Sequence, residues 1–167
     1  LPIIQTLRDL RETGDDIRRI EGMLSGTLSY LFSAWDGRVP FSTSLRDAKG
    51  KGYTEPDPRD DLSGTDVARK LIILGREMGL RLELDDIELV SLVPPSLAGC
   101  DAQTFLDRLP ELDGPMLERF NAARARGRVI RYVGALDAAT GRASVGLEEL
   151  EPTHPFANIN PTDNVVR

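Results

Sequence analysis

Apolar residues recur at intervals of three and four along much of the chain, which is the spacing of helices that bury one face. The clearest stretch runs over 62–78, where the apolar stripe consists of Ala68, Leu71, Ile72 and Leu74. The same spacing predicts helices at 1–11, 25–35, 42–49, 101–109 and 115–126. Pro2 suits the first turn of the first helix, and Gly14 and Gly79 stand where helices usually stop.

Shorter apolar runs predict strands at about 17–24 and 87–93, and a hairpin with arms at 128–136 and 143–150. These strands are scattered among the helices instead of alternating with them, which favours an α+β fold over a doubly wound sheet. No repeat or hinge divides the chain, so we expect one domain over 1–167. The first residue is not methionine and the last residues begin an apolar run, so we expect a domain taken from a longer polypeptide.

Composition and charge narrow the classes of partner. Hydrophobic residues make up 40% of the 167 positions, and 27 acidic against 21 basic residues give a net charge of −6. An acidic chain is poorly suited to nucleic acid or to an anionic membrane, since both favour a basic face. No apolar run approaches the roughly 20 residues that span a bilayer. The one cysteine and one histidine exclude a disulfide framework and a thiolate zinc cage. We expect a globular, cytoplasmic protein.

Lysine usage draws attention to one helix position. Only three of the 21 basic residues are lysines, and Lys70 stands in the middle of the helix expected over 62–78. It follows Asp66 by four residues, so the two side chains share a helix face. Such a pair can be an ordinary surface ion pair worth about 0.3–0.5 kcal/mol. It can also be functional, because a lysine, unlike an arginine, can exchange its proton.

Five carboxylates crowd the segment before and within this helix, namely Glu55, Asp57, Asp60, Asp61 and Asp66. Pro56 and Pro58 restrict the residues before them to extended conformations, so Glu55 and Asp57 should lie on a stiff, non-helical segment. Asp60 or Asp61 is a natural N-cap for the following helix. Three interpretations of this cluster remain open. The acids can cap the helix and face solvent, they can form a pocket for a substrate ammonium, or they can bind Mg²⁺ or Ca²⁺.

Other chemical signals are weak. The residues Ser25-Gly26-Thr27 open a helix, where backbone N–H groups favour a carboxylate or phosphate, although Ser25 can simply cap the helix. No Gly-x-Gly-x-x-Gly motif, Walker-type loop or Gly-x-Ser-x-Gly elbow is present in the sequence. We expect Cys100 and His154 to be structural.

The block from 48 to 70 reads AKGKGYTEPDPRDDLSGTDVARK and closely resembles the signature of the homoserine dehydrogenase family. That signature has Ala, Gly, Glu-Pro, Asp-Leu, Gly, Asp and Lys at fixed intervals, and this block departs from none of them. Segments at 1–4, 20–22, 25–30, 154–157 and 163–165 also resemble the family. The run EPDPRDD is most similar to fungal enzymes and to bacterial fusions with aspartate kinase.

The resemblance implies an activity and a fold. The family interconverts L-aspartate 4-semialdehyde and L-homoserine with NADH or NADPH, on the route to threonine, methionine and isoleucine. The implied fold is α+β, a mixed β-sheet covered by helices, and corresponds to the substrate-binding and dimerisation domain without the Rossmann domain.

The resemblance also implies roles for individual residues. Lys70 corresponds to the lysine that gives or takes the proton on the substrate oxygen, and Asp66 to the acid that supports it. Glu55 corresponds to the carboxylate that binds the substrate ammonium, and Asp61 to another acid of the substrate site. Residues implied to line the amino-acid pocket are Tyr53, Gly26 and Thr27.

Several implied features lie outside this chain. NAD(P)H would be bound mainly by the absent domain, which would also supply a second lysine and most of a monovalent-cation site. We therefore expect a homodimer-forming part of the enzyme that holds no metal and is inactive alone. Two alternatives stay open: a non-catalytic amino-acid-binding or dimerisation module, and a carboxylate-rich metal-binding domain. The enzyme requires Lys70 and Glu55 to meet in one pocket, whereas the non-catalytic module tolerates Lys70 in solvent.

Overall fold

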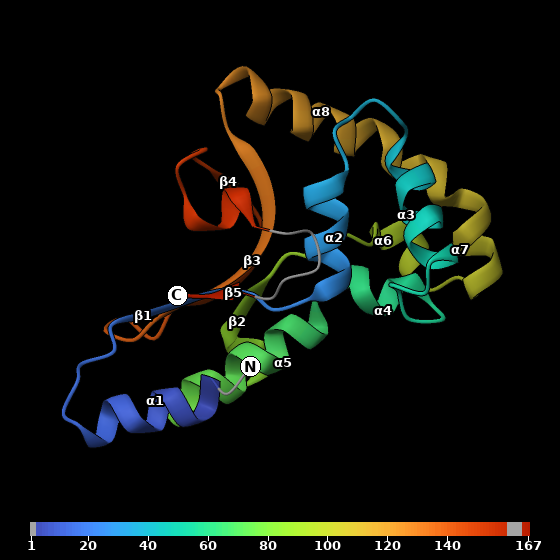
Figure 1. The fold of residues 1–167 in the computed structure, drawn as a ribbon. Coiled ribbons are helices and arrows are strands. Elements are labelled where there is room, and N and C mark those ends of the chain that lie inside the picture. Colours follow the sequence, from blue (N-terminus) through green and yellow to red (C-terminus); the bar gives the residue numbers. More distant parts are fainter. Residues whose placement is uncertain (1–2, 160–164) are drawn as a thin grey trace.

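One mixed sheet lies at the centre of the computed structural model, which describes residues 3–159 and 165–167 (Figure 1). Its strands are β1 (Arg19–Met23), β2 (Ile87–Leu89), β3 (Val129–Asp137), β4 (Ala143–Leu150) and β5 (Val165–Val166). The order across the sheet is β2-β4-β3-β1-β5, with β2 parallel to β4 and the other neighbours antiparallel. The expected α+β fold with a mixed sheet is confirmed.

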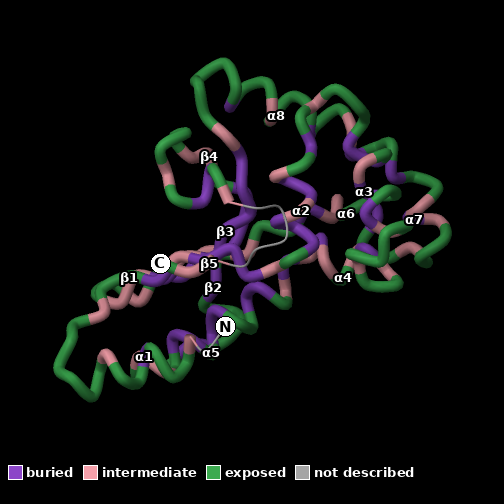
Figure 2. The backbone as a smooth tube through the Cα atoms, in the orientation of Figure 1, coloured by how far each residue is buried: buried purple, intermediate pink, exposed green. Residues whose placement is uncertain are grey.

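Helices build the main core on one face of this sheet. The longer helices are α1 (Ile3–Glu12), α2 (Gly26–Ala34), α3 (Phe41–Gly50), α5 (Thr65–Glu77), α7 (Ala102–Arg108) and α8 (Asp113–Ala125). Shorter ones are α4 (Pro58–Leu62), α6 (Pro95–Ala98) and the 3₁₀ turns η1 (Leu84–Asp86), η2 (Leu109–Leu112) and η3 (Pro155–Asn158). Helices α2, α5 and α8 contact β3, and α1 lies beside α5 (Figure 1). Buried backbone follows β3, α2 and α5, whereas much of α8 is exposed (Figure 2).

Alternation along β3 divides its side chains between the two faces of the sheet. Tyr132 and Leu136 belong to the main core beneath the helices. Val133 belongs to a smaller cluster with Met23 and Phe156, a residue of η3. Among the described residues, the segment that follows β4 therefore covers part of the second face.

The helix expected over 62–78 is confirmed as α5, but it begins at Thr65 instead of Leu62 because the chain turns at Gly64, and Leu62 ends the separate helix α4. Gly64 has a φ of +73°, and a Cβ at this position would lie 1.9 Å from the hydroxyl oxygen of Tyr132. Glycine alone tolerates both the left-handed backbone and this close approach. Helix α5 therefore begins at Thr65, with Tyr132 packed beneath its start.

The N-cap expected at Asp60 or Asp61 is wrong. Both residues lie inside α4, which begins at Pro58, and Asp57 is the cap. Proline fits a first helical position because its missing N–H would have no partner there. The extended conformation expected before the prolines is confirmed for Asp57, whose φ and ψ are −103° and 108°.

Strand β2 ends at Leu89, earlier than the strand expected over 87–93. The N–H of Leu92 donates to the carbonyl of Leu62 in α4 instead of to the sheet. The expected roles of Leu1, Pro2, Asp163 and Asn164 fall outside the described residues. Within the described ranges, none of the helices combines the length and the apolarity that a bilayer crossing needs.

Candidate active site

A pocket of about 470 Å³ lies where four parts of the chain meet: the start of α2, the loop that follows α3, helix α4 and helix α5. Its lining residues are Ser25, Gly26, Thr27, Tyr30, Gly52, Tyr53, Glu55, Asp61, Asp66 and Lys70. The seven residues to which the sequence resemblance assigns site roles are among them, whereas Asp57 and Asp60 of the acidic cluster are not. The structure thus brings together side chains from three separate segments of the chain.

Lys70 is held at this pocket by two acceptors. Its Nζ lies 2.6 Å from Oδ2 of Asp66, one helical turn earlier in α5, and 2.9 Å from the carbonyl oxygen of Leu24. Leu24 belongs to the connection between β1 and α2, so the lysine joins α5 to the start of α2. An ammonium has three N–H donors, and these contacts engage two of them. One donor remains for an oxygen atom in the pocket.

Glu55 and Asp61 are coupled through the backbone. The N–H of Glu55 donates to Oδ2 of Asp61 at 2.8 Å, which ties the extended loop to α4. A neighbouring pocket of about 370 Å³ shares Glu55, Asp61 and Asp66 and adds Asp60 and Arg69. The acids thus form a wall between the two pockets, and the Lys70 pocket combines one ammonium with three carboxylates.

The start of α2 forms another side of the pocket. Ser25 is the N-cap, as its sequence position allowed, and its hydroxyl accepts from the N–H of Leu28 at 3.3 Å. The hydroxyl of Thr27 donates to the carbonyl of Tyr53 at 2.5 Å and so attaches the loop to α2. Because the first N–H groups of a helix have no partner within it, the amides of Gly26 and Thr27 are suited to an anionic group.

Tyr30 is a pocket residue that the sequence reasoning missed. Its ring meets that of Tyr53 edge-on, with centroids 4.7 Å apart. Lys51 donates to the Tyr30 hydroxyl at 2.9 Å and to Asp47 at 2.7 Å, and these hydrogen bonds raise the pKa of Lys51. The available signal was the spacing, because Tyr30 follows Thr27 by three residues and shares its helix face.

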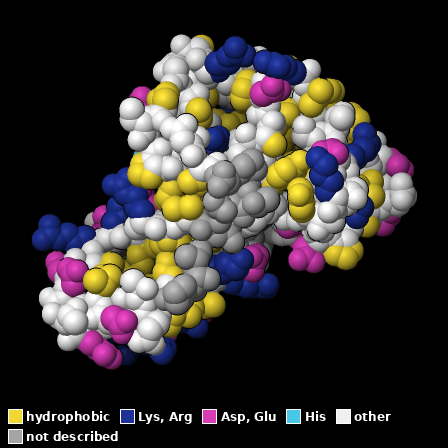
Figure 3. Space-filling model, viewed as in Figure 1, with side chains coloured by type: hydrophobic (Ala, Val, Ile, Leu, Met, Phe, Trp, Pro, Cys, Tyr) yellow, Lys and Arg dark blue, Asp and Glu magenta, His cyan; other side chains and the backbone are white. Residues whose placement is uncertain are grey.

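Two of the other hollows bear on the choice of candidate site. An apolar groove of about 250 Å³ touches Lys70 from the side of α1 and is lined by Ile3, Ile4, Leu24, Ile73, Leu74 and Val166. Apolar side chains are visible at the surface between α1 and the sheet (Figure 3). Lys70 lines both this groove and the candidate site.

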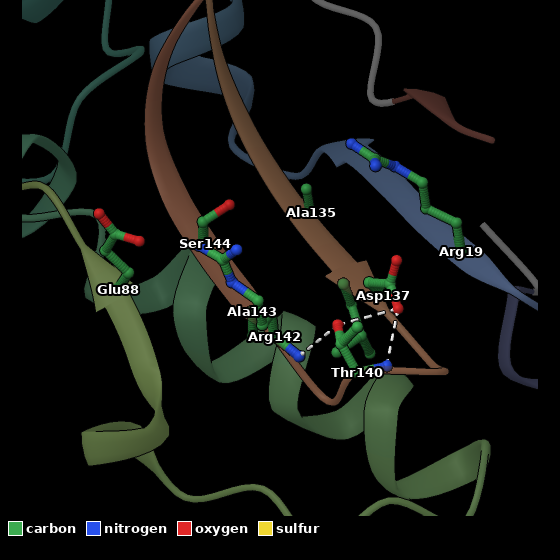
Figure 4. A pocket seen from close by; sticks show the side chains of 9 residues that line it. Arg19, Glu88, Ala135, Asp137, Thr140, Arg142, Ala143 and Ser144 are labelled. Carbon is green, nitrogen blue, oxygen red and sulfur yellow. Dashed lines mark hydrogen bonds between the residues drawn. The ribbon is translucent and has the colours of Figure 1, made fainter.

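The other hollow is a pocket of about 270 Å³ near the tip of the β3–β4 hairpin, with Arg19, Glu88 and Asp137 around it (Figure 4). Asp137 accepts from the N–H and the hydroxyl of Thr140, and these hydrogen bonds lower its pKa. Arg19 is paired with Glu21. Since these groups satisfy turn and strand contacts, this pocket is a weaker candidate than the one at Lys70.

The cysteine and the histidine, Cys100 and His154, make structural contacts, as expected from the sequence. The thiol of Cys100 donates to the carbonyl of Leu97 at 3.2 Å, and His154 caps η3 by accepting from the N–H of Phe156 at 3.2 Å. Neither residue lines the Lys70 pocket. Within residues 3–159 and 165–167, no group of three or more His, Cys, Asp or Glu side chains is arranged to hold a metal ion.

Comparison with known proteins identifies the class to which this fold and pocket belong. The family model described as homoserine dehydrogenase matches residues 2–167. A bifunctional aspartokinase/homoserine dehydrogenase 2 of Zea mays, named as chloroplastic, is 54% identical over 99% of this chain and 18% of its own length. The homoserine dehydrogenase of Schizosaccharomyces pombe is 44% identical over 99% of this chain and 46% of its own.

A solved structure agrees with these matches. A Candida auris protein described as of unknown function superposes with a TM-score of 0.94 and 44% identity, covering 99% of this chain and 48% of that one. The chain belongs to the homoserine dehydrogenase family. It spans less than half the length of these relatives.

Proposed function

We propose that the chain is the substrate-binding and catalytic part of a homoserine dehydrogenase that interconverts L-aspartate 4-semialdehyde and L-homoserine with NAD(P)H. The observation behind the proposal is the contact of Lys70 with Asp66 and the Leu24 carbonyl inside a pocket that also contains Glu55 and Asp61. The reaction would belong to the synthesis of threonine, methionine and isoleucine. The family and the geometry of the pocket both support this assignment.

Lys70 is the proposed proton donor and acceptor. When a hydride adds to the aldehyde carbon, the carbonyl oxygen gains negative charge and must take up a proton to become the alcohol. The N–H of Lys70 that neither Asp66 nor Leu24 engages supplies it, and in homoserine oxidation the neutral amine accepts it back. General acid–base catalysis of this kind contributes about 10²–10⁴ in rate. The ammonium also stabilises the developing oxyanion before the proton moves.

Asp66 and Leu24 orient the amine in both protonation states. A neutral amine still has two N–H donors, which match the two acceptors, so its lone pair is left for the substrate oxygen. In the ammonium form, the third N–H occupies that direction. The proposed proton transfer therefore needs no rearrangement of the side chain.

Recognition of the amino-acid part is assigned to the pocket walls. A zwitterionic substrate needs an anion for its ammonium and N–H donors for its carboxylate. Glu55 supplies the first, with Asp61 as the second substrate-site acid. The amides of Gly26 and Thr27 supply the donors, and Tyr53 also lines the pocket.

The cofactor supplies the hydride, and its nucleotide part is assigned mainly to regions of the parent protein outside this chain. The sequence contains no Gly-x-Gly-x-x-Gly motif, which is the usual pyrophosphate-binding turn. The apolar groove that contains Leu24, Ile73 and Leu74 fits the flat, largely apolar face of a nicotinamide ring, and Lys70 lines the same groove. These residues therefore fit the reactive end of the cofactor.

The proposal includes a homodimer in the cytoplasm. The maize relative is named as chloroplastic, so imaging of a fluorescent fusion of the parent protein is the test of location. Elution of the parent protein at the mass of a monomer would contradict the dimer.

The direct test is an enzyme assay on the parent protein and on the 167-residue chain. We expect the parent to reduce NAD⁺ or NADP⁺ with L-homoserine, and the chain alone to show little or no turnover. Turnover by the chain alone would contradict the assignment of the nucleotide site to other regions. A parent that binds homoserine without oxidising it would instead support the non-catalytic amino-acid-binding module.

A further inference from the structure

Two of the three acids of the substrate pocket, Glu55 and Asp61, lie on a segment with few stabilising contacts of its own. Glu55 is exposed on an extended loop, and Asp61 lies in α4, which has only five residues. A helix of one or two turns is not stable by itself in water, so tertiary contacts must fix α4. The side chain of Arg59, in the first turn of α4, provides the most extensive polar contacts of this kind.

The guanidinium of Arg59 forms a bidentate, fork-like ion pair with the carboxylate of Asp57. Nε lies 3.0 and 3.1 Å from the two carboxylate oxygens of Asp57, and Nη2 lies 2.6 Å from Oδ2. Both side chains are shielded, with 18% of Arg59 and 28% of Asp57 exposed. The contact lowers the pKa of Asp57, which is also the N-cap of α4. The fork therefore fixes the turn between Glu55 and the helix that contains Asp61.

The same guanidinium reaches across to a distant part of the chain. Nη1 donates to the carbonyl of Cys100, and the guanidinium carbon lies 5.5 Å from the ring centroid of Phe105 in α7. Planar, multidentate contacts of this kind suit an arginine and cannot all be made by a lysine. Arg59 thus attaches the loop and α4 to the layer formed by α6 and α7.

Lys70 is held independently of this fork. Its acceptors are Asp66, in its own helix, and the Leu24 carbonyl, before α2. Loss of the Arg59 contacts should therefore displace Glu55 and Asp61 without moving the proposed proton donor. The acids that bind the substrate and the lysine of the chemical step are therefore held by separate sets of contacts.

We propose that Arg59 is a positioning residue that sets the Glu55 and Asp61 carboxylates and thereby the affinity for the amino-acid substrate. This inference rests on the proposed function, because its kinetic test assumes that the parent enzyme oxidises homoserine. The test uses the complete parent enzyme with Arg59→Met, which keeps an unbranched chain but removes every polar contact. We expect KM for homoserine to rise about 10-fold while kcat stays within about 3-fold, since only ground-state binding is lost.

Three comparisons sharpen the test. Arg59→Lys should give an intermediate KM, because an ammonium keeps one contact with Asp57, and it serves if the Met variant folds poorly. Arg126→Met is the matched control, since Arg126 forms a similar fork on Glu149 far from the pocket, and its KM should not change. In a Glu55→Gln background, Arg59→Met should raise KM by less than about 3-fold, because coupled residues are not additive.

An unchanged KM in Arg59→Met overturns the proposal, as does a loss of kcat as large as the loss of kcat/KM. Fully additive effects in the double variant also overturn it. Calorimetric titration with homoserine gives a readout that does not need turnover, and Kd should rise by the same factor as KM. A parent that binds homoserine without oxidising it would contradict the proposed function, whereas an unchanged Kd in Arg59→Met would contradict the role of Arg59.

Discussion

The Nζ of Lys70 donates a 2.9 Å hydrogen bond to the carbonyl oxygen of Leu24, a residue 46 positions earlier in the chain. Leu24 connects β1 to α2, so this bond brings the proposed proton donor to the start of the helix that offers the Gly26 and Thr27 amides. A backbone acceptor cannot ionise. The lysine therefore keeps this partner in every protonation state.

Replacement of Lys70 by arginine in the parent enzyme should lower kcat by about 10²-fold or more, with KM within about 3-fold. An arginine keeps the positive charge but does not release its proton at neutral pH. Steady-state kinetics with homoserine and NADP⁺ measure both constants. Arg76→Lys is a matched control on the same helix, away from the pocket, and should leave kcat unchanged. An unchanged kcat in Lys70→Arg would remove Lys70 from the mechanism.

Replacement of Glu55 by glutamine should raise KM for homoserine by about 10-fold, because a neutral amide is a weaker partner for an ammonium than a carboxylate. The glutamine has nearly the same size, so the loop should keep its shape. Glu88→Gln is the control, since Glu88 lines the other polar pocket in Figure 4. If Glu88→Gln raised KM and Glu55→Gln did not, the substrate pocket would be the one at the hairpin tip.

Replacement of the buried Arg131 by methionine should destabilise the chain by roughly 3 kcal/mol, because it leaves buried carbonyls without donors. Arg131 is 8% exposed and donates to the carbonyls of Phe32, Ile130, Phe156 and Ala157. Burial lowers the pKa of Arg131, because the charged guanidinium loses contact with water. Urea denaturation of the chain measures the change, with exposed Arg38→Met as the control. A loss below about 1 kcal/mol would show that these contacts contribute little net stability.

Tyr132 should make the fold sensitive to alkali. Burial raises the pKa of its phenol to about 12 because the phenolate would be desolvated, and its hydroxyl donates to the Val90 carbonyl at 3.1 Å. A group whose pKa is higher in the folded state contributes stability that is constant below about pH 10, the unfolded value. That contribution is lost as the pH rises through about 12.

Thermal unfolding of wild type and Tyr132→Phe between pH 9 and 12 tests this dependence. The stability of the wild type should fall more steeply than that of the phenylalanine variant over the upper part of the range. Difference absorbance between the two proteins should place the ionisation of Tyr132 near pH 12. Equal slopes, or ionisation of the folded phenol near pH 10, would contradict the effect of burial.

Periodicity sufficed to predict the helices whose apolar stripes face the sheet, but it placed the start of α5 three residues too early. The stripe from Ala68 to Leu74 correctly indicated α5, since the period of a helix is a local property. The actual start follows Gly64, where a side chain would collide with the Tyr132 hydroxyl, 68 residues away in β3. Tyr30 was missed for a similar reason, because its contacts come from Tyr53 and Lys51 on another segment.

By itself, the sequence determined the helix faces, the extended segment at the prolines, the acidic charge and the residue pattern that resembles the homoserine dehydrogenase family. These properties follow from local spacing and from residue identity. Tertiary structure alone decided that Lys70 would reach the Leu24 carbonyl, that α4 and α5 would separate, and that Arg59 would join α4 to the layer of α6 and α7. The physical reason is that each depends on atoms distant in the chain, whose positions are fixed only when the core packs.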